Sequence, residues 1–460
     1  MTIGCPVERR HALAPPRPLP RALPIAMALA LALGTLLPTR AVAIDLEYDL
    51  GTHISYSDNI NLSQTAPQDD TVVAPTVRFE VSQAGADVQI DGRGLLQFTD
   101  YLDDSFADEF RAEFTGGLYW EMLPSRLIMV FQDYLSQQNI EFRTRTTPDN
   151  LQQVNFFVIG PSFYAHFNPA MRGQFDLRYG NTYAEETEAF NGDRYSAAVR
   201  VRREISATTE ITGNLEAARI EYDPAGEAAN YDRHDAYLAF NVRRPVLSLN
   251  MDLGYSQLDL ESGKNTSAPL ARGEVVAEVS ARSRLRVDLR YQLTDATEYL
   301  ITPMREVTDG QPYLDLAYPD ISVNPNVFRE RSVRTSYEYN APRTSLRLMP
   351  YYRRIAYVDA AVVDPLDEAL SDQSIKGALL EVEYRLRPLL SAEFNFAREE
   401  RDYEVDSRND THTTVNLGLT KRFTRHWSGR IGAGYRKNTS SVSGEGYEEK
   451  VAMLSIEYKR

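Results

Sequence analysis

Long stretches of alternating apolar and polar residues recur along the chain. In the clearest stretch, one parity is apolar: Phe110, Ala112, Phe114, Gly116, Leu118, Trp120 and Met122. The opposite parity is mostly polar: Arg111, Glu113, Thr115, Tyr119 and Glu121. Because successive side chains of a strand point to opposite faces, this pattern predicts a strand with one apolar face and one charged face.

The predicted strand is long enough to cross a membrane. A tilted transmembrane strand needs about 9–11 residues, whereas strands of soluble proteins are usually about 5–6 residues long. A tight turn, Leu123-Pro124-Ser125-Arg126, follows, and an apolar stretch beginning at Leu127 leads the chain back. The hairpin over residues 108–134 therefore has the form expected of a transmembrane β-barrel hairpin.

Short and long connections alternate through the rest of the chain. Gly, Pro and Asn signals place further tight turns near residues 84–85, 168–169, 206–208, 244–245, 281–283, 340–342, 387–388 and 424–426. Longer polar loops are expected near residues 57–70, 103–108, 138–152, 184–195, 222–234, 259–269, 295–326, 356–373, 401–411 and 437–449. Outer-membrane barrels alternate in this way between short periplasmic turns and long extracellular loops.

These connections predict the fold class. Residues 44–460 should form an all-β, transmembrane, antiparallel up-and-down barrel of about 18–20 strands, with both ends on the periplasmic side. The uncertainty in strand number reflects weak strand patterns at the first hairpin and near residues 319–326. A repeat of roughly 40 residues also fits a β-propeller, but a propeller blade packs four short strands into that length. Each repeat here holds two long strands, which favours the barrel.

Residues 1–43 read as a secretory signal peptide. They begin with a basic region, continue with an apolar run from Leu23 to Leu37, and end in the small residues Ala41-Val42-Ala43. The alternative is an N-terminal membrane anchor, but a run of about fifteen apolar residues is short for a membrane span. We therefore expect export and cleavage after Ala43.

Composition narrows the class of protein further. Asp and Glu together number 65 against 50 Lys and Arg, for a net charge of −15, which argues against a nucleic-acid partner. The single cysteine, Cys5, lies within the predicted signal peptide, so no disulfide framework is expected. No apolar run after Leu37 approaches the length of a transmembrane helix. These features predict a location in the outer membrane of a Gram-negative bacterium.

The polar faces of the predicted strands should line the lumen, because Arg or Lys facing lipid costs about 2–4 kcal/mol at mid-membrane. The candidate lining residues are Asp176, Arg178, Arg200, Arg202, Arg284, Arg286, Asp288, Arg290, Arg347, Arg353, Glu381 and Glu383. For any one of them, an ion pair that only braces the wall is the simpler interpretation. Together they predict a hydrated, mixed-charge channel, because a barrel of this strand number is wide enough to leave one open.

The sequence predicts no enzyme, catalytic residue, cofactor or metal site. The histidines after residue 43 are His53, His166, His234, His412 and His426, and none has metal-ligand spacing to another. The chain has no nucleophile elbow and no glycine-rich nucleotide motif. A dyad of His234 and Asp235 at a loop edge is the one catalytic alternative.

The first predicted strand ends in the run Tyr56-Ser57-Asp58-Asn59-Ile60. With this run and Gly116-Gly117-Leu118, the chain resembles outer-membrane β-barrel porins of the porin 2 type, which are associated with exopolysaccharide systems. The resemblance implies a barrel that helps a polysaccharide leave the cell together with a periplasmic export partner, and it supplies no catalytic residues. Asp58 and Asn59 are expected to form an Asx turn. The chain departs from many such barrels by ending in Lys459 and Arg460 rather than in an aromatic residue.

The leading functional hypothesis is a polar channel for exopolysaccharide export, and the alternative is a general diffusion porin for small solutes. An adhesion barrel and a membrane enzyme are weaker alternatives. Expected partners are outer-membrane lipid and lipopolysaccharide, a polysaccharide chain and a periplasmic export protein. The proline-rich loop at residues 295–326 either folds into the pore as a gate or lies on the surface.

Overall fold

The computed structural model describes residues 44–223, 230–261, 263, 265–299, 323–358, 372–404 and 407–460. The predicted signal peptide, residues 1–43, lies outside these ranges. So do residues 300–322, most of the predicted gate loop.

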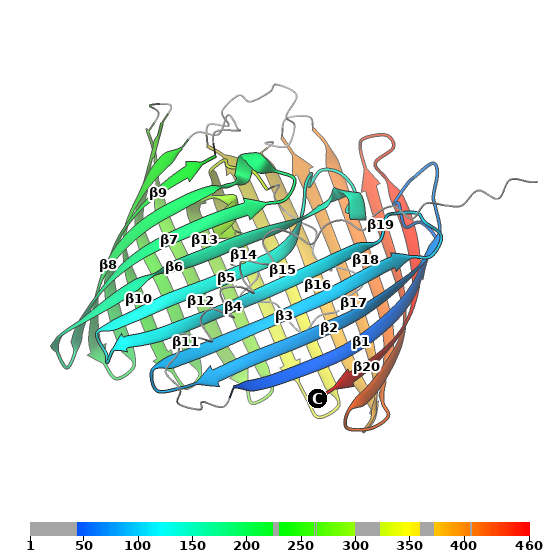
Figure 1. The fold of residues 1–460 in the computed structure, drawn as a ribbon, viewed down its shortest axis with the longest axis horizontal. Coiled ribbons are helices and arrows are strands. Elements are labelled where there is room, and N and C mark those ends of the chain that lie inside the picture. Colours follow the sequence, from blue (N-terminus) through cyan, green and yellow to red (C-terminus); the bar gives the residue numbers. More distant parts are fainter. Residues whose placement is uncertain are drawn as a thin grey trace, which may run out of the picture.

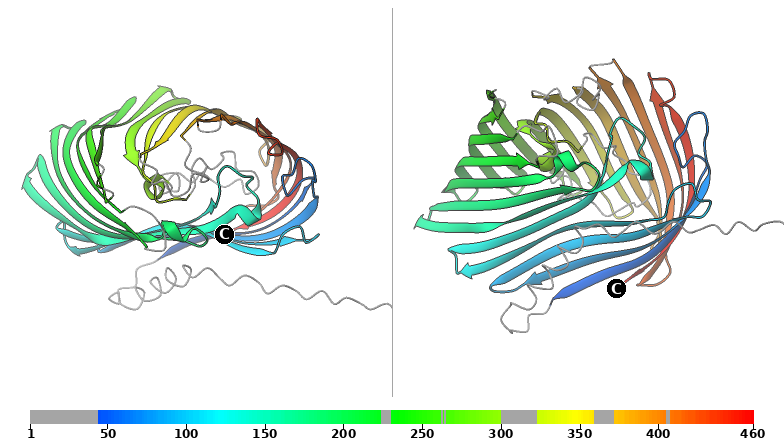
Figure 2. Two further views of the ribbon diagram at one scale, coloured as in Figure 1. Left: turned by 90° about the horizontal axis from the view of Figure 1, so that it is seen from above. Right: turned by 45° about the horizontal axis from the view of Figure 1, so that its top comes forward.

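Within the described ranges, twenty antiparallel strands form one closed sheet (Figure 1). The strands are β1 (Asp45–Ser57), β2 (Asp70–Ala84), β3 (Val88–Tyr101), β4 (Glu109–Leu123), β5 (Leu127–Asn139), β6 (Leu151–Asn168), β7 (Met171–Ala184), β8 (Gly192–Ser206), β9 (Thr209–Tyr222), β10 (Tyr231–Arg244), β11 (Leu247–Leu260), β12 (Asn265–Ser280), β13 (Ser283–Thr294), β14 (Phe328–Asn340), β15 (Thr344–Tyr357), β16 (Gln373–Arg387), β17 (Leu390–Tyr403), β18 (Asn409–Arg422), β19 (Trp427–Ser440) and β20 (Tyr447–Lys459). Each strand pairs with the next, and β1 pairs with β20, so the strands form a ring when seen from above (Figure 2). The predicted fold class is confirmed, at the upper end of the predicted strand number.

Tight turns follow the even-numbered strands from β2 to β18, and the longer loops follow the odd-numbered strands, as predicted. In the turn between β4 and β5, the Arg126 amide donates to the Leu123 carbonyl at 3.0 Å. The Arg460 amide donates to the Tyr48 carbonyl at 3.0 Å, so the C-terminus lies beside β1 at the tight-turn edge (Figure 1). No helix in the described part of the chain has the length and apolar character to cross a membrane.

The outer face of the sheet carries an apolar band. Residues that pair across neighbouring strands point to the same face of the sheet. The pairing therefore identifies, strand by strand around the ring, which alternate residues point outward. Exposed apolar side chains of this parity include Leu50, Ile54, Val77, Phe98, Phe175, Leu215, Leu253, Leu289, Leu348, Leu417, Ile431 and Ile456. Exposed aromatic residues flank the band, among them Tyr179, Tyr195, Tyr255 and Tyr352 toward the long loops and Tyr384 and Trp427 toward the tight turns. An apolar band between aromatic girdles is typical of a membrane-spanning barrel.

The sequence run around Asn59 closes the barrel. The Asn59 side-chain amide donates to the Glu448 carbonyl at 2.8 Å, and the Ser57 hydroxyl donates to the Glu449 carboxylate at 2.7 Å. The Lys450 amide donates to the Asp58 carboxylate at 2.7 Å. An Asx turn was predicted here, but the Asn59 side chain instead bonds both the amide and the carbonyl of Ser63, four residues later, besides its bond to the Glu448 carbonyl. The motif thus joins the first strand to the last.

Candidate functional site

Contacts across the ring identify the inner face of the sheet. The Phe142 ring, from the loop between β5 and β6, lies 6.0 Å from the Tyr403 ring on β17. Several strands separate β6 from β17 in either direction around the sheet, so these rings meet through the interior. Figure 2 shows the segment after β5, in teal, turning into the ring. The face of β17 that carries Tyr403 is therefore the inner face.

The register extends this assignment around the barrel. Arg401 shares a face with Tyr403 and pairs with Ile375, which pairs with Arg353 on β15. The same pairing can be traced from strand to strand as far as β7. It places every predicted lining residue on the inner face: Asp176, Arg178, Arg200, Arg202, Arg284, Arg286, Asp288, Arg290, Arg347, Arg353, Glu381 and Glu383. Their action on a permeating molecule stays a prediction.

Many of these side chains form ion pairs along the wall. Arg200 pairs with Asp176 of β7 and, at 2.7 Å, with Glu216 of β9. Asp176 also lies 3.3 Å from Arg178 and accepts from the Ser162 hydroxyl at 2.6 Å. Further pairs are Arg202–Glu210, Arg284–Glu278, Arg286–Glu274, Arg347–Glu381 and Arg353–Glu330. The inner wall is thus polar throughout this region while its opposite charges largely compensate one another.

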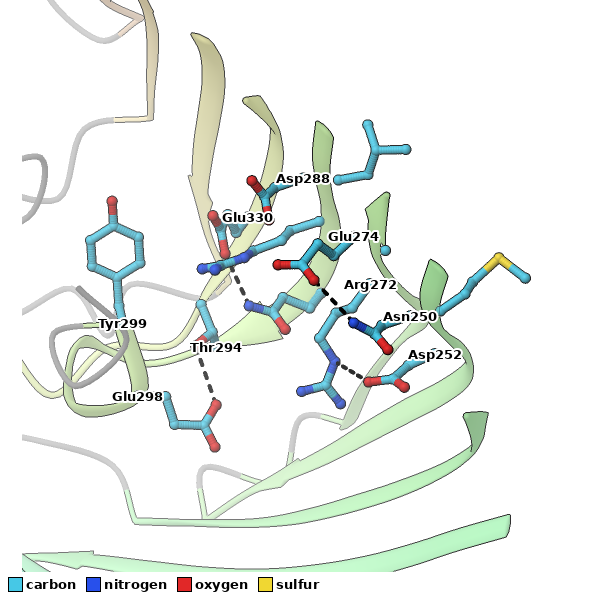
Figure 3. A pocket seen from close by; sticks show the side chains of 14 residues that line it. Asn250, Asp252, Arg272, Glu274, Asp288, Thr294, Glu298, Tyr299 and Glu330 are labelled. Carbon is cyan, nitrogen blue, oxygen red and sulfur yellow. Dashed lines mark hydrogen bonds and ion pairs between the residues drawn. The ribbon is translucent and has the colours of Figure 1, made fainter. Parts of the chain in front are cut away.

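A polar cavity of about 520 Å³ lies against the inner face of β11–β14 (Figure 3). Its lining includes Asn250, Asp252, Arg272, Glu274, Asp288, Arg290, Glu298 and Glu330. Asn250 donates to Glu274 at 3.0 Å, and the Arg272 Nε lies 3.4 Å from Asp252. Amide, carboxylate and guanidinium groups together can exchange hydrogen bonds with a hydroxyl-rich solute.

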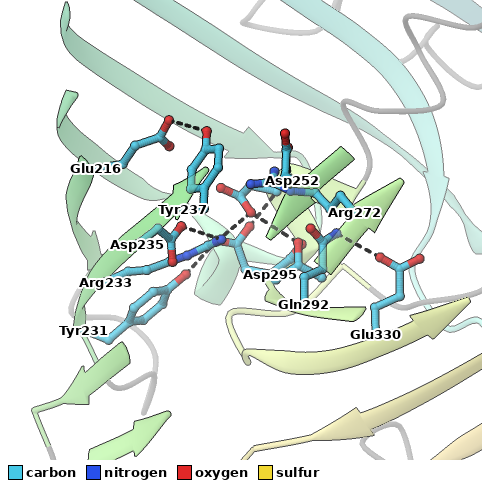
Figure 4. Close-up of polar contacts among 12 residues, drawn as sticks. Glu216, Tyr231, Arg233, Asp235, Tyr237, Asp252, Arg272, Gln292, Asp295 and Glu330 are labelled. Carbon is cyan, nitrogen blue, oxygen red and sulfur yellow. Dashed lines mark hydrogen bonds and ion pairs between the residues drawn. The ribbon is translucent and has the colours of Figure 1, made fainter. Parts of the chain in front are cut away.

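The start of the predicted gate loop folds onto the inner wall. After β13, residues 296–299 are helical, and Glu298 pairs with Arg233 of β10 at 2.6 Å and with Arg194 of β8 at 3.3 Å. Asp295 is fully buried and accepts from the Tyr231 hydroxyl at 2.6 Å (Figure 4). Burial alone would raise the pKa of Glu298, but the two guanidinium groups lower it to about 2. The loop base is therefore anchored by charge to strands β8 and β10.

The long-loop end of the interior is apolar, which the sequence analysis did not predict. A buried cluster there includes Phe156, Phe190, Ile220, Leu258, Tyr299, Val323, Phe328, Ile355 and Ile375. Residues such as Ile355 and Ile375 occupy inner-face positions that the alternating pattern assigns to polar side chains. Both are fully buried, and they belong to one cluster with Tyr299 and Val323, which flank residues 300–322 in the chain.

A second inward loop, residues 140–150, was expected only as part of a polar loop near residues 138–152. Its Phe142 and Arg143 are buried, at 5% and 8% exposure. The Arg143 guanidinium lies 5.0 Å from the centre of the Tyr403 ring, and Arg408 donates to the Arg143 carbonyl at 2.8 Å. The Asn150 side-chain amide donates to the carbonyls of Glu141 and Arg145, which fixes the shape of the loop. The only local signal was one phenylalanine within a polar run.

The described residues contain no group of three or more His, Cys, Asp or Glu that could hold a metal ion. The alternative dyad of His234 and Asp235 is not formed. Asp235 pairs with Arg233 on the inner face at 2.9 Å, whereas His234 lies on the outer face, 3.9 Å from Asp259. Neighbouring residues in a strand point to opposite sides, which separates the two side chains.

Residues 357–460 match the family model described as "Putative beta-barrel porin 2". The resemblance stated from the sequence is thereby confirmed over this part of the chain. Together, the closed barrel and this family match indicate a porin-like β-barrel channel of the Gram-negative outer membrane. No sequence among the curated proteins matches the chain.

Several solved structures show similarity to this chain. The siderophore receptor PirA from Pseudomonas aeruginosa is 10% identical with a TM-score of 0.45, over 92% of this chain and 81% of the receptor. A mutant of the ferric enterobactin receptor PfeA from the same species is 10% identical with a TM-score of 0.46, over 92% and 81%. The FrpB iron transporter from Neisseria meningitidis is 8% identical with a TM-score of 0.42, over 90% and 83%.

Proposed function

We propose that this barrel is a channel through which an exopolysaccharide leaves the cell. The observation that carries the proposal is the inner wall, where charges of both signs are paired and hydrogen-bonding groups face the interior. A wall of this kind lacks a strong field of one sign, so it suits a hydrated polymer better than a particular small ion. The family resemblance points in the same direction.

Inner-face tyrosines add a second kind of contact for sugars. Tyr237 donates its hydroxyl to Glu216 at 2.8 Å, while the Arg272 guanidinium lies 5.1 Å from the centre of its ring. Tyr351, also on the inner face, contacts Glu399 through its hydroxyl. Tyrosine offers an apolar ring face together with a hydroxyl, which suits the mixed apolar and polar surface of a sugar.

The two inward loops supply a constriction for this channel. The segment at residues 140–150 contacts β17 and Arg408, which immediately precedes β18, and residues 295–299 contact β8 and β10. Both segments lie on the inner wall, where they would narrow the path of a polymer through the interior. We infer that the loops keep the channel narrow until polymer arrives.

In this proposal the signal peptide is cleaved after Ala43 during export. The tight turns and both ends of the barrel then lie on the periplasmic side. A periplasmic export partner would then meet the barrel at the tight turns. The long loops would face the outside of the cell, as they do in outer-membrane barrels generally.

A gene deletion tests the proposal. Loss of the barrel should leave polysaccharide synthesis intact, reduce the glycan on the cell surface and trap it in the periplasm. Expression of the wild-type gene should restore export. The diffusion-porin alternative predicts instead that the deletion strain exports its polysaccharide normally and takes up small hydrophilic solutes more slowly.

Planar bilayers distinguish the two functions on the purified protein. Fragments of the exported polysaccharide should interrupt the ionic current through an export channel in discrete, voltage-dependent events. A dextran of similar size serves as the control polymer. Equal effects of the two polymers would indicate a non-selective pore.

A further inference from the structure

Arginines gather along one half of the tight-turn edge of the barrel, the lower edge in Figure 1. They lie at the five consecutive tight turns from β10–β11 to β18–β19. We use the term basic arc for six exposed arginines there: Arg243, Arg282, Arg343, Arg385, Arg422 and Arg425. Arg244, Arg387 and Lys421 lie at the same turns but on the outer face, so they are not included. Within the described part of the chain, no carboxylate forms an ion pair with the basic arc.

Three arginines of the basic arc lie at the mouth of the lumen. The strand register places Arg243, Arg385 and Arg422 on the inner face. Arg385 donates to the Pro342 carbonyl at 3.3 Å, and Arg422 donates to the Pro388 carbonyl at 3.4 Å. Each carbonyl belongs to the neighbouring tight turn, so these two side chains are held along the rim. A guanidinium group has five N–H donors, so one carbonyl leaves donors for a ligand.

Acidic side chains offset only part of this charge. The carboxylates closest in sequence to the basic arc are Glu278, Glu338 and Glu383. Glu278 is already paired with Arg284 at 2.8 Å. On the other half of the tight-turn edge, by contrast, Arg126, Arg172 and Arg203 occur alongside Asp87, Glu121, Glu204 and Glu210. Excess positive charge is therefore confined to the half of the rim between β10 and β19.

The long-loop edge carries charge of the opposite sign over much of its length. The segments at residues 57–70, 101–109 and 184–192 contain several Asp and Glu residues but no Lys or Arg. Between the two edges, the ion pairs of the inner wall largely cancel one another. A polyanion would therefore be attracted to the tight-turn end of the lumen and repelled from these long loops.

A polar cavity lies at the same end of the lumen. Its volume is about 610 Å³, and it occupies the inner face of β4–β11, beside the tight turns. Tyr164 and Tyr237 line it together with the amides of Gln174 and Asn214. Aromatic rings beside amide groups suit the mixed apolar and polar surface of sugar rings. The mouth thus fits a sugar polymer that enters the lumen better than a protein that docks on its rim.

We propose that the basic arc receives a polysaccharide that carries carboxylate groups, at the end of the lumen where the polymer enters. Arginine binds carboxylates through paired, charge-assisted hydrogen bonds. Arginines repeated at successive turns can engage several acidic sugars of one chain at once, which strengthens binding through multivalency. This proposal rests on the proposed function and adds the chemical class of the transported polymer.

Block of the ionic current in planar bilayers tests the site on the purified barrel. The probe is a fragment of polygalacturonate, and dextran of the same length is the neutral control. Polygalacturonate should interrupt the current at a concentration at least about tenfold lower than dextran, and from only one of the two chambers. Raising the salt concentration from about 0.1 to 1 M should remove most of this difference, because the Debye length falls from about 10 to 3 Å.

Variants assign the effect to the basic arc. R385Q/R422Q should need at least about tenfold more polygalacturonate for the same block, with its response to dextran unchanged. The matched control, R126Q/R203Q, removes two exposed arginines at the same edge but outside the basic arc, and it should behave like the wild type. If R385Q/R422Q does not form channels, R282Q/R343Q, with its changes at two tight turns, replaces it and should show the same loss.

Equal block of the wild type by the acidic and the neutral fragments would overturn the proposal. So would an equal loss in the arc variant and the control variant. An arc variant that binds polygalacturonate like the wild type but loses export in cells would show that the basic arc serves a periplasmic protein instead. Failure of the proposed function itself would appear separately, as normal export in the deletion strain.

Discussion

Arg408 donates a hydrogen bond of 2.8 Å to the main-chain carbonyl of Arg143, which lies 265 positions earlier in the chain. Both residues are buried, and the Phe142 and Tyr403 rings pack beside them. A hydrogen bond to a charged donor contributes roughly 1.5–3 kcal/mol, and an aromatic pair adds about 0.5–1.5 kcal/mol. Contacts of this size hold a loop closed while leaving an open state within thermal reach.

The first prediction concerns this loop. Replacing Arg408 with Ala removes the donor to Arg143 and the ion pair to Asp410, so the loop at residues 140–150 should detach more often. We expect a higher mean single-channel conductance or more frequent open steps in planar bilayers. Lys437→Ala, which removes an exposed outer-face ion pair with Glu448, serves as the control. Unchanged conductance in Arg408→Ala would show that the loop does not limit the current.

The second prediction concerns the two faces of β13. Val287 pairs with Val275 and Thr335 on the outer face, whereas Arg286 lies on the inner face near Glu274. Val287→Arg should impair assembly, because Arg facing lipid costs about 2–4 kcal/mol at mid-membrane. Arg286→Ala should assemble normally. Heat-modifiable migration of outer-membrane fractions measures both, and the reverse order would show that the faces are inverted.

The third prediction concerns the seam between β1 and β20. Asn59→Ala removes the side-chain bonds to the Glu448 carbonyl and to the Ser63 backbone. Because the Asn59 side chain is buried, the loss should lower the free energy of unfolding by about 1–3 kcal/mol. Asn61→Ala, which removes two solvent-exposed side-chain hydrogen bonds of the same loop, is the control. Urea unfolding monitored by tryptophan fluorescence compares them, and equal stability would remove the proposed role of Asn59.

The fourth prediction concerns pH. The pKa of Glu298 lies at about 2, below its ordinary value of 4.5, so the folded state favours the charged form. Its contribution to loop docking is therefore fully present above about pH 4.5 and is lost as the pH falls toward 2. Conductance should stay constant between pH 8 and pH 5 and rise only under strong acid.

Glu298→Gln tests the same contact at neutral pH. At pH 7 the variant should already show the higher conductance that the wild type shows only under strong acid, because its glutamine carries no charge to pair with Arg233 and Arg194. A wild-type conductance step between pH 5 and pH 7, or a variant identical to the wild type, would contradict this account.

The sequence by itself determined the barrel. In Phe110 to Met122, and again in Arg284 to Gln292, alternation distinguishes the two faces of a strand, because one must meet lipid and the other the polar interior. Turns such as Asn168-Pro169 and Arg387-Pro388 followed from Pro and Asn signals that act within a few residues. These local effects need no knowledge of the other strands, which is why the face of each predicted charged residue could be assigned.

The tertiary structure alone decided what fills the interior and how the ring closes. Asn59 meets Glu448, and Phe142 meets Tyr403, only after the sheet has curved until distant strands approach. Ile355 and Ile375 break the polar pattern of the inner face, and they are buried in one cluster with residues of other segments, such as Tyr299 and Val323. Contacts between residues hundreds of positions apart leave no periodic signal in either segment, so the sequence predicts the wall of the channel but not its constriction.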